Sequence, residues 1–317
     1  GCLRSAPVTA VPPASDSNAD PAFDAAFDID AVRRQFPALD LPHDERLPRI
    51  YLDNPAGTQV PVGVLDAMRD VMIRSNANMG GWFRTTREAT ALSAEAHQAM
   101  ADMYGAASPD EIVFGANMTT LTFVMARALA ERFEPGDEMI ITSMEHEGNN
   151  SPWRQMAGDR GMIVRTWGFD RDRYELDLDE LDALIGPRTR FAALNHASNL
   201  LGTINPIGEA CRRLSAAGAI TYVDSVQYAP HGPIDVQALG CDFLVASAYK
   251  FYGPHQGVLY GRRELLETSP ARFLRTVPDR IPDRWESGTQ SLEGQVGTTA
   301  AVEYLADLGR AAGAAAN

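Results

Sequence analysis

Cysteine is scarce in this sequence, which has three in 317 residues: Cys2, Cys211 and Cys241. Their spacing fits neither a disulfide framework nor a zinc motif. Cys211 falls in a helix-like stretch and Cys241 at the start of an apolar run, where cysteine acts as a small core residue. This usage disfavours a disulfide-stabilised secreted fold and suits a reducing compartment, so we expect a cytoplasmic protein.

Positive charge is scarce as well. Lys and Arg together number 28 against 42 Asp and Glu, which gives a formal net charge of −14. This balance argues against nucleic acid or an anionic membrane as the main partner. A small anionic ligand stays possible, because a local site can oppose the overall charge. No apolar run is long enough to cross a membrane, and the 45% hydrophobic content is typical of a globular protein with a sizeable core.

Composition and periodicity divide the chain. Residues 1–20 are rich in Ala, Pro and Ser, and we expect them to be disordered. Residues 21–110 should form an N-terminal segment with helices that pack on a large domain over 111–290, and residues 291–317 a final helix. Because the sequence begins with Gly, we expect a fragment or a processed form.

From Glu111 onward, short apolar strands alternate with helical patterns. This alternation predicts an α/β fold with a mostly parallel sheet and helices on both faces. Before it, we expect a short strand over 50–58, broken by a Pro/Gly turn. Ligands of such sheets bind outside the carboxyl ends of the strands. The predicted strands are 112–114, 138–143, 162–167, 191–195, 220–223, 243–246 and 258–260.

A lysine stands at one of these strand ends, in Ser247-Ala248-Tyr249-Lys250. The preceding run, Cys241–Ala246, is typical of a strand buried on both faces. An ammonium group costs free energy to desolvate unless it is paired or neutral. A lysine with a lowered pKa can be a nucleophilic amine that attacks carbonyl compounds or pyridoxal 5'-phosphate (PLP). The plainer alternative is a lysine that reaches from the strand end into water.

Asp224 follows the strand 220–223 and could be a cofactor partner, a metal ligand or a cap. A carboxylate beside the pyridine nitrogen of PLP keeps that nitrogen protonated. The stretch Asn117-Met118-Thr119-Thr120 precedes a helix, and it is either an anion site or a plain N-cap.

His146 lies between two glutamates after another strand. No second histidine has ligand spacing to it, so a metal site is disfavoured. The remaining alternatives are an imidazole stacked on a flat cofactor and a hydrogen-bonded surface histidine. Asn199 and Gln227 also follow strand ends, where each could hydrogen-bond a ring hydroxyl.

Five stretches, taken in order, resemble the cysteine desulfurases and selenocysteine lyases, a branch of the PLP-dependent class V aminotransferase family. The resemblance runs from about Tyr51 to Leu305. It implies a fold-type I large domain that binds PLP over 111–290, a small amino-acid substrate, and a homodimer with a shared active site. The stretches are 144–146, 197–203, 223–227, 250–254 and 286–289.

The resemblance also implies roles for individual residues. Lys250 resembles the Schiff-base lysine that moves the α-proton, Asp224 the partner of the pyridine nitrogen, and His146 the imidazole stacked on the ring. Gln227 resembles the residue that bonds the ring oxygen, and Asn199 the amide near the cofactor and the substrate carboxylate. Phosphate contacts are implied for Met118, Thr119, Ser247 and, through its hydroxyl, Tyr249; Gly288-Thr289 would reach the phosphate of the other subunit.

The sequence departs from the family pattern in several places. Tyr249 stands where desulfurases often have histidine, and Asn117-Met118-Thr119 replaces a Gly-Thr-Thr type of turn. Relatives continue into a small C-terminal domain that carries a carboxylate-binding arginine and, in desulfurases, a persulfide-forming cysteine. The sequence stops at Asn317 before both, so we expect the 317-residue chain to lack useful desulfurase activity.

The sequence thus predicts a PLP-dependent, cysteine desulfurase-like lyase. A class V aminotransferase or an epimerase is the first alternative, because a fold does not determine a reaction. The second alternative is a truncated relative that binds PLP without turnover.

Overall fold

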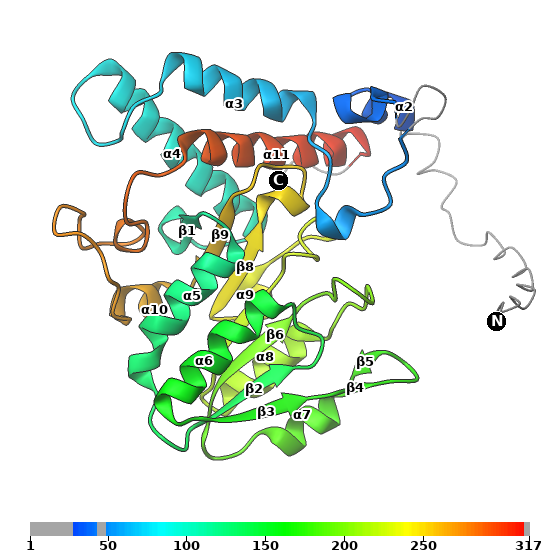
Figure 1. Cartoon of the computed structure of the whole chain (residues 1–317), viewed down its shortest axis with the longest axis vertical. Coiled ribbons are helices and arrows are strands. Elements are labelled where there is room, and N and C mark those ends of the chain that lie inside the picture. The colour runs from blue at the N-terminus through cyan, green and yellow to red at the C-terminus, as the bar shows by residue number, and fades with distance from the viewer. Residues whose placement is uncertain (1–27, 43–48, 314–317) are drawn as a thin grey trace, which may run out of the picture.

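The computed structural model describes residues 28–42 and 49–313 (Figure 1). Residues 1–20, for which the composition predicts disorder, lie outside the described residues, as does Cys2. Within the described part of the chain, no helix is both long and apolar enough to cross a membrane.

The centre of the molecule is a seven-stranded sheet in which only β9 runs against the other strands. The mostly parallel sheet predicted from the sequence is therefore confirmed. A separate two-stranded ribbon pairs β4 (Phe169–Asp170) with β5 (Glu175–Leu176). In spatial order the large sheet contains β1 (Ile112–Gly115), β9 (Gly257–Gly261), β8 (Phe243–Ser247), β7 (Ile220–Asp224), β6 (Thr189–Asn195), β2 (Glu138–Thr142) and β3 (Ile163–Trp167).

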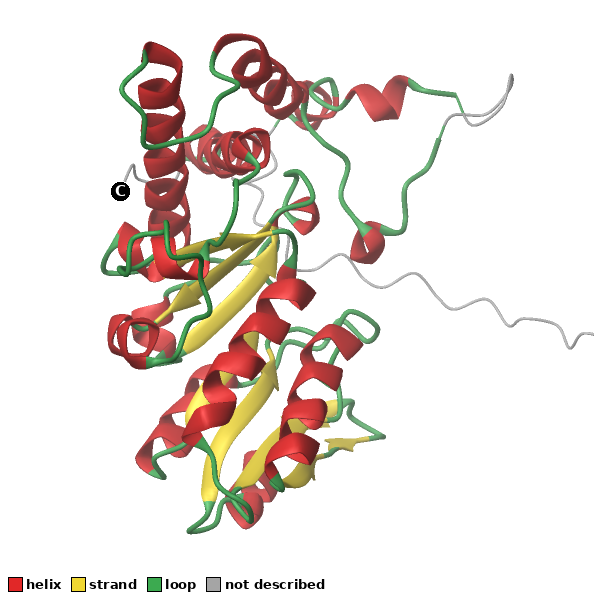
Figure 2. Ribbon diagram, turned by 60° about the vertical axis from the view of Figure 1, so that its left-hand side comes forward, coloured by secondary structure: helices red, strands yellow, loops and turns green. Residues whose placement is uncertain are grey.

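Helices cover both faces of the sheet, because alternate side chains of each strand point to opposite faces. Val113 of β1 joins one buried cluster with side chains of α5 (Met118–Leu129), α6 (Ser151–Arg160) and α10 (Arg263–Thr268). Its neighbours Ile112 and Phe114 join the other cluster. Figure 2 shows the helices on the two faces of the sheet. The second face is covered by α4 (Arg84–Tyr104), α7 (Leu178–Leu184), α8 (Ile207–Ala216) and α9 (Val236–Leu239).

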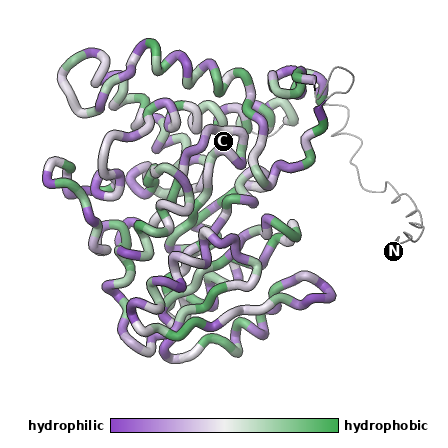
Figure 3. The backbone as a smooth tube through the Cα atoms, in the orientation of Figure 1, coloured by the Kyte–Doolittle hydropathy of each residue, from purple (hydrophilic) through white to green (hydrophobic). Residues whose placement is uncertain are grey.

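Beyond one end of the sheet, α11 (Leu292–Ala311) packs against α3 (Val62–Arg74) and α4. Figure 3 shows hydrophobic colour along the inner strands and mixed colour along α3. The short helix α2 (Ile29–Arg33) begins where the Asp28 carboxylate accepts the Ala31 N–H at 2.9 Å. Short 3-10 turns are η1 (Pro37–Asp40), η2 (Asn54–Ala56), η3 (Pro109–Glu111), η4 (Ala130–Arg132), η5 (Glu147–Asn149), η6 (Ala248–Lys250) and η7 (Asp283–Trp285).

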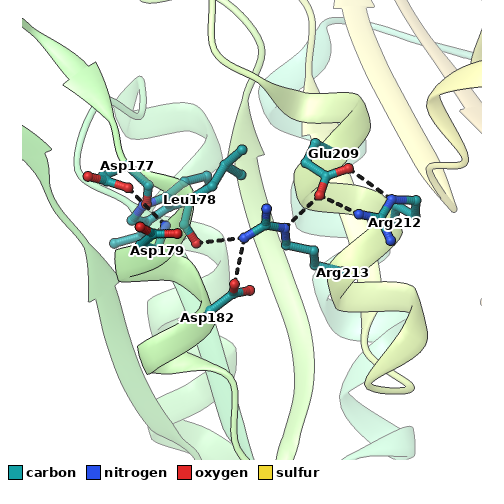
Figure 4. Close-up of polar contacts among 8 residues, drawn as sticks. Asp177, Leu178, Asp179, Asp182, Glu209, Arg212 and Arg213 are labelled. Atoms are coloured by element: carbon teal, nitrogen blue, oxygen red, sulfur yellow. Dashed lines mark hydrogen bonds and ion pairs between the residues drawn. The ribbon is translucent and has the colours of Figure 1, made fainter.

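Polar contacts connect α7 and α8 at the surface (Figure 4). Arg213 of α8 contacts Asp182 at 2.6 Å and donates to the Leu178 carbonyl at 3.0 Å. Hydrogen bonds from Arg212 and Arg213 lower the pKa of Glu209 to about 2. Of these two helices, α8 packs against β6 and β7, whose ends carry site residues, and α7 packs against β3.

The predicted strand over 50–58 is wrong. This segment is irregular apart from η2, and its backbone pairs with the turn after β8 instead of a sheet strand. The Thr58 N–H donates to the Tyr249 carbonyl at 3.0 Å, and the Thr58 Oγ1 accepts the Tyr252 N–H at 2.8 Å. Pro55 has no N–H to give to a ladder, which favours a turn at this position. The segment consequently lies beside Lys250.

Candidate active site

A cavity of about 670 Å³ opens at the carboxyl ends of β6, β7 and β8. The structure brings all but one of the predicted site residues to it, because consecutive parallel strands end at the same edge of the sheet. Thr289 is the exception: it is exposed and lies outside this lining. The predicted residues that line the cavity are Met118, Thr119, His146, Asn199, Asp224, Gln227, Ser247, Tyr249 and Lys250.

Lys250 ends the turn η6, three residues after β8, and is only 7% exposed. Its Nζ donates to the Pro55 carbonyl and lies 4.5 Å from the centre of the Tyr249 ring. Lys250 is also the only lysine in the sequence, so all other cationic side chains apart from histidine are arginines. A guanidinium keeps its proton and is no nucleophile, so amine chemistry by a side chain has to take place here.

Asp224 is the last residue of β7 and pairs in register with Asn195 of β6 and Val245 of β8. Its Oδ1 accepts the Val226 N–H at 2.9 Å, while its Oδ2 accepts no hydrogen bond from the described residues. Burial raises the pKa of Asp224 to about 6, although the Val226 N–H and Lys250 act to lower it. The free oxygen can accept an N–H from a bound ligand.

A buried histidine, His196, holds the backbone of Asp224 in place. The backbone N–H of His196 donates to the Asp224 carbonyl at 2.9 Å. Its Nδ1 lies 2.7 Å from Ser225 Oγ, and its ring stacks on Tyr228 at 3.7 Å between centroids. Burial lowers the pKa of His196 to about 4, so this ring is neutral at pH 7. These contacts fix the backbone that carries the Asp224 carboxylate.

His146 begins the turn after β2, and its Nδ1 accepts the Gly148 N–H at 3.0 Å. The ring proton of the neutral form therefore lies on Nε2. A Cβ at Gly148 would lie 2.7 Å from Thr119 Oγ1 and 3.1 Å from His146 Nδ1. Because Gly148 has no side chain, the turn can lie close to the start of α5. This close approach helps to shape the cavity.

Glu145 precedes His146; the residue is half-buried, its carboxyl group is enclosed by protein, and it does not line the cavity. Its carboxyl contacts Thr142 Oγ1 at 2.7 Å and Asn149 Nδ2 at 2.8 Å. Burial raises the pKa of Glu145 well above its ordinary range, and the negative charge of Asp224 adds to the effect. The region thus contains two buried carboxyl groups, and only Asp224 faces the cavity.

The start of α5 and the end of β8 meet at one end of the cavity. Ser247 Oγ accepts the Met118 N–H at 3.0 Å, so its own hydroxyl hydrogen is left for another acceptor. The Asn117 side chain accepts the Thr120 N–H at 2.9 Å and is the N-cap of α5. Of the two alternatives for this stretch, an anion site and a plain N-cap, Asn117 therefore has the N-cap role. The Thr119 N–H and the hydroxyls of Thr119 and Ser247 supply donors for an anion.

Gln227 lines the cavity, and its Nε2 donates to the Pro55 carbonyl at 3.0 Å. Pro55 therefore accepts from both Gln227 and Lys250, and the segment around it forms one wall of the cavity. The sequence patterns did not reveal this wall or three further lining residues, Asn195, Val226 and His255. The histidine follows the Gly253-Pro254 turn five residues after Lys250, a position that could have identified it.

Neither of the described cysteines lines the cavity. Cys211 and Cys241 are both buried and unpaired. Burial raises the pKa of Cys211 to about 12 and moves that of Cys241 well above its ordinary value. Within the described ranges no group of His, Cys, Asp and Glu has the arrangement of a metal site.

The sequence model of the family "Aminotransferase class-V" matches residues 50–317. A cysteine desulfurase of Dickeya dadantii is 37% identical over 298 residues, which cover 89% of this chain and 72% of the relative. A cysteine desulfurase of Yersinia pseudotuberculosis is 37% identical over 305 residues, with 90% and 73% covered.

Solved structures agree with these sequence matches. The cysteine desulfurase CsdA of Escherichia coli superposes with a TM-score of 0.79 at 32% identity, covering 89% of this chain and 72% of that chain. The apo cysteine desulfurase of Thermococcus onnurineus superposes with a TM-score of 0.82 at 31% identity, with the same shares covered. The structural similarity therefore includes the sheet and the cavity-bearing strand ends.

Proposed function

Because the chain belongs to the class V aminotransferase family, we propose that it is a PLP-dependent lyase of the cysteine desulfurase type. Its fold is that of the fold-type I PLP-dependent transferases, and it is a PLP-dependent enzyme that acts on an amino acid. The observation that carries the proposal is the position of Lys250. The only lysine of the sequence is buried at the end of β8, in the same cavity as Asp224.

The residues of the cavity fit PLP. Asp224 offers an oxygen that accepts nothing from the described residues, as the pyridine N–H requires. Thr119 and Ser247 offer hydrogen-bond donors at the start of α5, which suits a phosphate group. The close approach allowed by Gly148 keeps His146 beside the start of α5. Lys250 supplies the amine that would hold the cofactor covalently.

The proposal assigns a chemical role to each of these cavity residues. When bound, PLP supplies an electron-withdrawing ring that stabilises negative charge on the amino acid. Asp224 would hold a proton at the ring nitrogen through a charge-assisted hydrogen bond. His146 would cover one face of the ring, and the Gln227 amide would donate to a ring oxygen. Lys250 Nζ would hold the cofactor and would also remove the α-proton of the substrate and return it.

The proposed substrate is a small amino acid with a leaving group on its β-carbon, because the similar proteins described above are cysteine desulfurases. The buried, high-pKa thiols of Cys211 and Cys241 are poor acceptors of sulfur. We propose that the sulfur leaves to a thiol that reaches the cavity from elsewhere. The cytoplasmic location expected from cysteine usage stays a prediction.

Product analysis tests the reaction type. The protein with PLP is given L-cysteine and dithiothreitol, and alanine, sulfide and pyruvate are measured. Alanine and sulfide in equal amounts support the lyase. Keto-acid formation from cysteine that depends on an added 2-oxo acid as amino acceptor would show an aminotransferase, and racemised cysteine would show an epimerase. Bound PLP without any of these products would contradict the lyase proposal for this chain and would favour the alternative from the sequence, a relative that binds PLP without turnover.

We also propose a homodimer in which Gly288-Thr289 reaches the active site of the other subunit. Thr289 is exposed and lies outside the cavity of its own chain. Large apolar side chains are exposed around the connection between α3 and α4: Met72 is 57%, Ile73 68%, Trp82 91% and Phe83 79% exposed. Such a group of apolar side chains is typical of a surface that another protein covers.

A further inference from the structure

His255 lies on the turn between η6 and β9 and lines the 670 Å³ cavity. Together with Ala56 and Tyr249 it also lines a neighbouring cavity of about 490 Å³. Its ring stacks on the Tyr249 ring, with 4.8 Å between centroids and 19° between planes. No described residue hydrogen-bonds its ring nitrogens. The imidazole is thus held by stacking and keeps both nitrogens available.

The packing of its neighbours places His255 at the α5 end of the cavity. A Cβ at Gly257 would lie 2.4 Å from the carbonyl carbon of Asn117, so only glycine allows this approach. Gln256 Nε2 donates to the Gly115 carbonyl at 2.6 Å, and the Gln256 carbonyl accepts the Ala248 N–H at 2.8 Å. Residues 255–257 consequently run along residues 115–117, which lead into α5.

A positive charge near the start of α5 would add to the hydrogen-bond donors of Thr119 and Ser247 in holding a phosphate. The described residues that line the cavity include no arginine. Lys250 is committed to covalent attachment, and His146 uses Nδ1 to accept the Gly148 N–H. Amide and backbone N–H donors are present in the lining, but His255 is the remaining side chain that can bring a full positive charge to a phosphate oxygen.

On the premise of the proposed function, we propose that His255 binds the phosphate group of PLP directly and selects the phosphorylated cofactor over pyridoxal. Tyr249 positions the imidazole by stacking on it.

Two cofactor forms test the inference without an activity assay. Dissociation constants for PLP and for pyridoxal are measured by absorbance titration of the wild type, His255→Ala and His255→Gln. In His255→Ala the preference for PLP over pyridoxal should fall about tenfold, the loss expected for one charge-assisted hydrogen bond. His255→Gln should retain part of the preference, because its amide donates a neutral hydrogen bond. His231→Ala, an exposed histidine outside the cavity, is the matched control.

Tyr249 variants separate stacking from direct contact. Tyr249→Phe keeps the stacked ring and should keep most of the preference, whereas Tyr249→Ala should lose it as His255→Ala does. An unchanged preference in His255→Ala, in a protein whose Lys250 still takes up PLP, overturns the inference and leaves the proposed function intact. If the wild type binds neither compound, the proposed function fails and the inference fails with it.

Discussion

Lys250 Nζ donates a hydrogen bond to the carbonyl of Pro55, which lies 195 positions earlier in the sequence. Gln227 Nε2 donates to the same oxygen at 3.0 Å. One backbone carbonyl therefore holds two side chains that the proposed function assigns to the cofactor. Both have to leave Pro55 when the cofactor binds, so this wall of the cavity holds the two side chains in place before binding.

Asp224→Ala should impair chemistry more than cofactor binding. Without the carboxylate the ring nitrogen loses its proton and the ring stabilises negative charge less well. The lost charge-assisted hydrogen bond is of about 1.5–3 kcal/mol, which corresponds to a fall in kcat of roughly 10- to 100-fold. The Kd for PLP should rise by a smaller factor, because the donors of Thr119 and Ser247 remain. Steady-state kinetics and a PLP titration measure both, and unchanged turnover would refute the assigned role.

The cofactor-free protein should show the cost of burying Asp224. Its pKa is raised from 3.8 to about 6 by burial, so the folded state binds more protons than the unfolded state between these values. The free energy of unfolding therefore falls as the pH rises through this window. Asp224→Asn removes the effect and should be up to about 3 kcal/mol more stable than the wild type at pH 7.5, with no difference near pH 3.8. Denaturant unfolding across this range measures it, and a pH-independent difference would exclude this explanation.

Glu145 should tolerate a neutral isostere. Its raised pKa favours the protonated form, which Glu145→Gln imitates: the new amide can donate to Thr142 Oγ1 and accept from Asn149 Nδ2. We expect a change in unfolding free energy within about 1 kcal/mol for Gln, and a loss of about 2–3 kcal/mol for Glu145→Ala, which leaves two buried polar groups unpaired. Thermal and denaturant unfolding compare the variants. Equal destabilisation by Gln and Ala would mean that a charged carboxylate is required.

The proposed homodimer should depend on the exposed aromatic side chains between α3 and α4. Trp82→Asp should weaken association by about 2–4 kcal/mol, because a buried aromatic anchor is typical of interface hot spots. Val124→Asp changes a partly exposed apolar side chain on α5, far from this connection in sequence, and serves as the control. Sedimentation velocity over a concentration series measures the dissociation constant. A wild type that stays monomeric throughout would disprove the dimer.

The sequence was sufficient to predict the sheet and many of the residues that line the cavity, since both follow from local patterns. Buried strands are apolar throughout, and the chemistry of parallel sheets lies at strand ends, which led to Asp224, Ser247 and Lys250. The presence of a single lysine in the whole sequence is a stronger indication of this site than the spacing of Lys250 from other residues.

Long-range contacts were beyond sequence patterns. The wall around Pro55 depends on a contact between residues 195 positions apart in the sequence, and its apolar residues suggested a strand that does not form. His255 is exposed and has no periodic pattern around it. Its relation to Tyr249 arises only when β9 returns antiparallel to β8.

The central claim is that Lys250 holds PLP covalently, and borohydride reduction tests it most directly. The protein is incubated with PLP, reduced, digested and mapped by mass spectrometry, with Lys250→Ala treated in parallel. The account predicts one pyridoxyl group per chain, on the peptide that contains Lys250, and no internal label in Lys250→Ala. Because the sequence has no other lysine, an unlabelled Lys250 peptide in PLP-treated wild type, or label confined to the N-terminal amine, would contradict it.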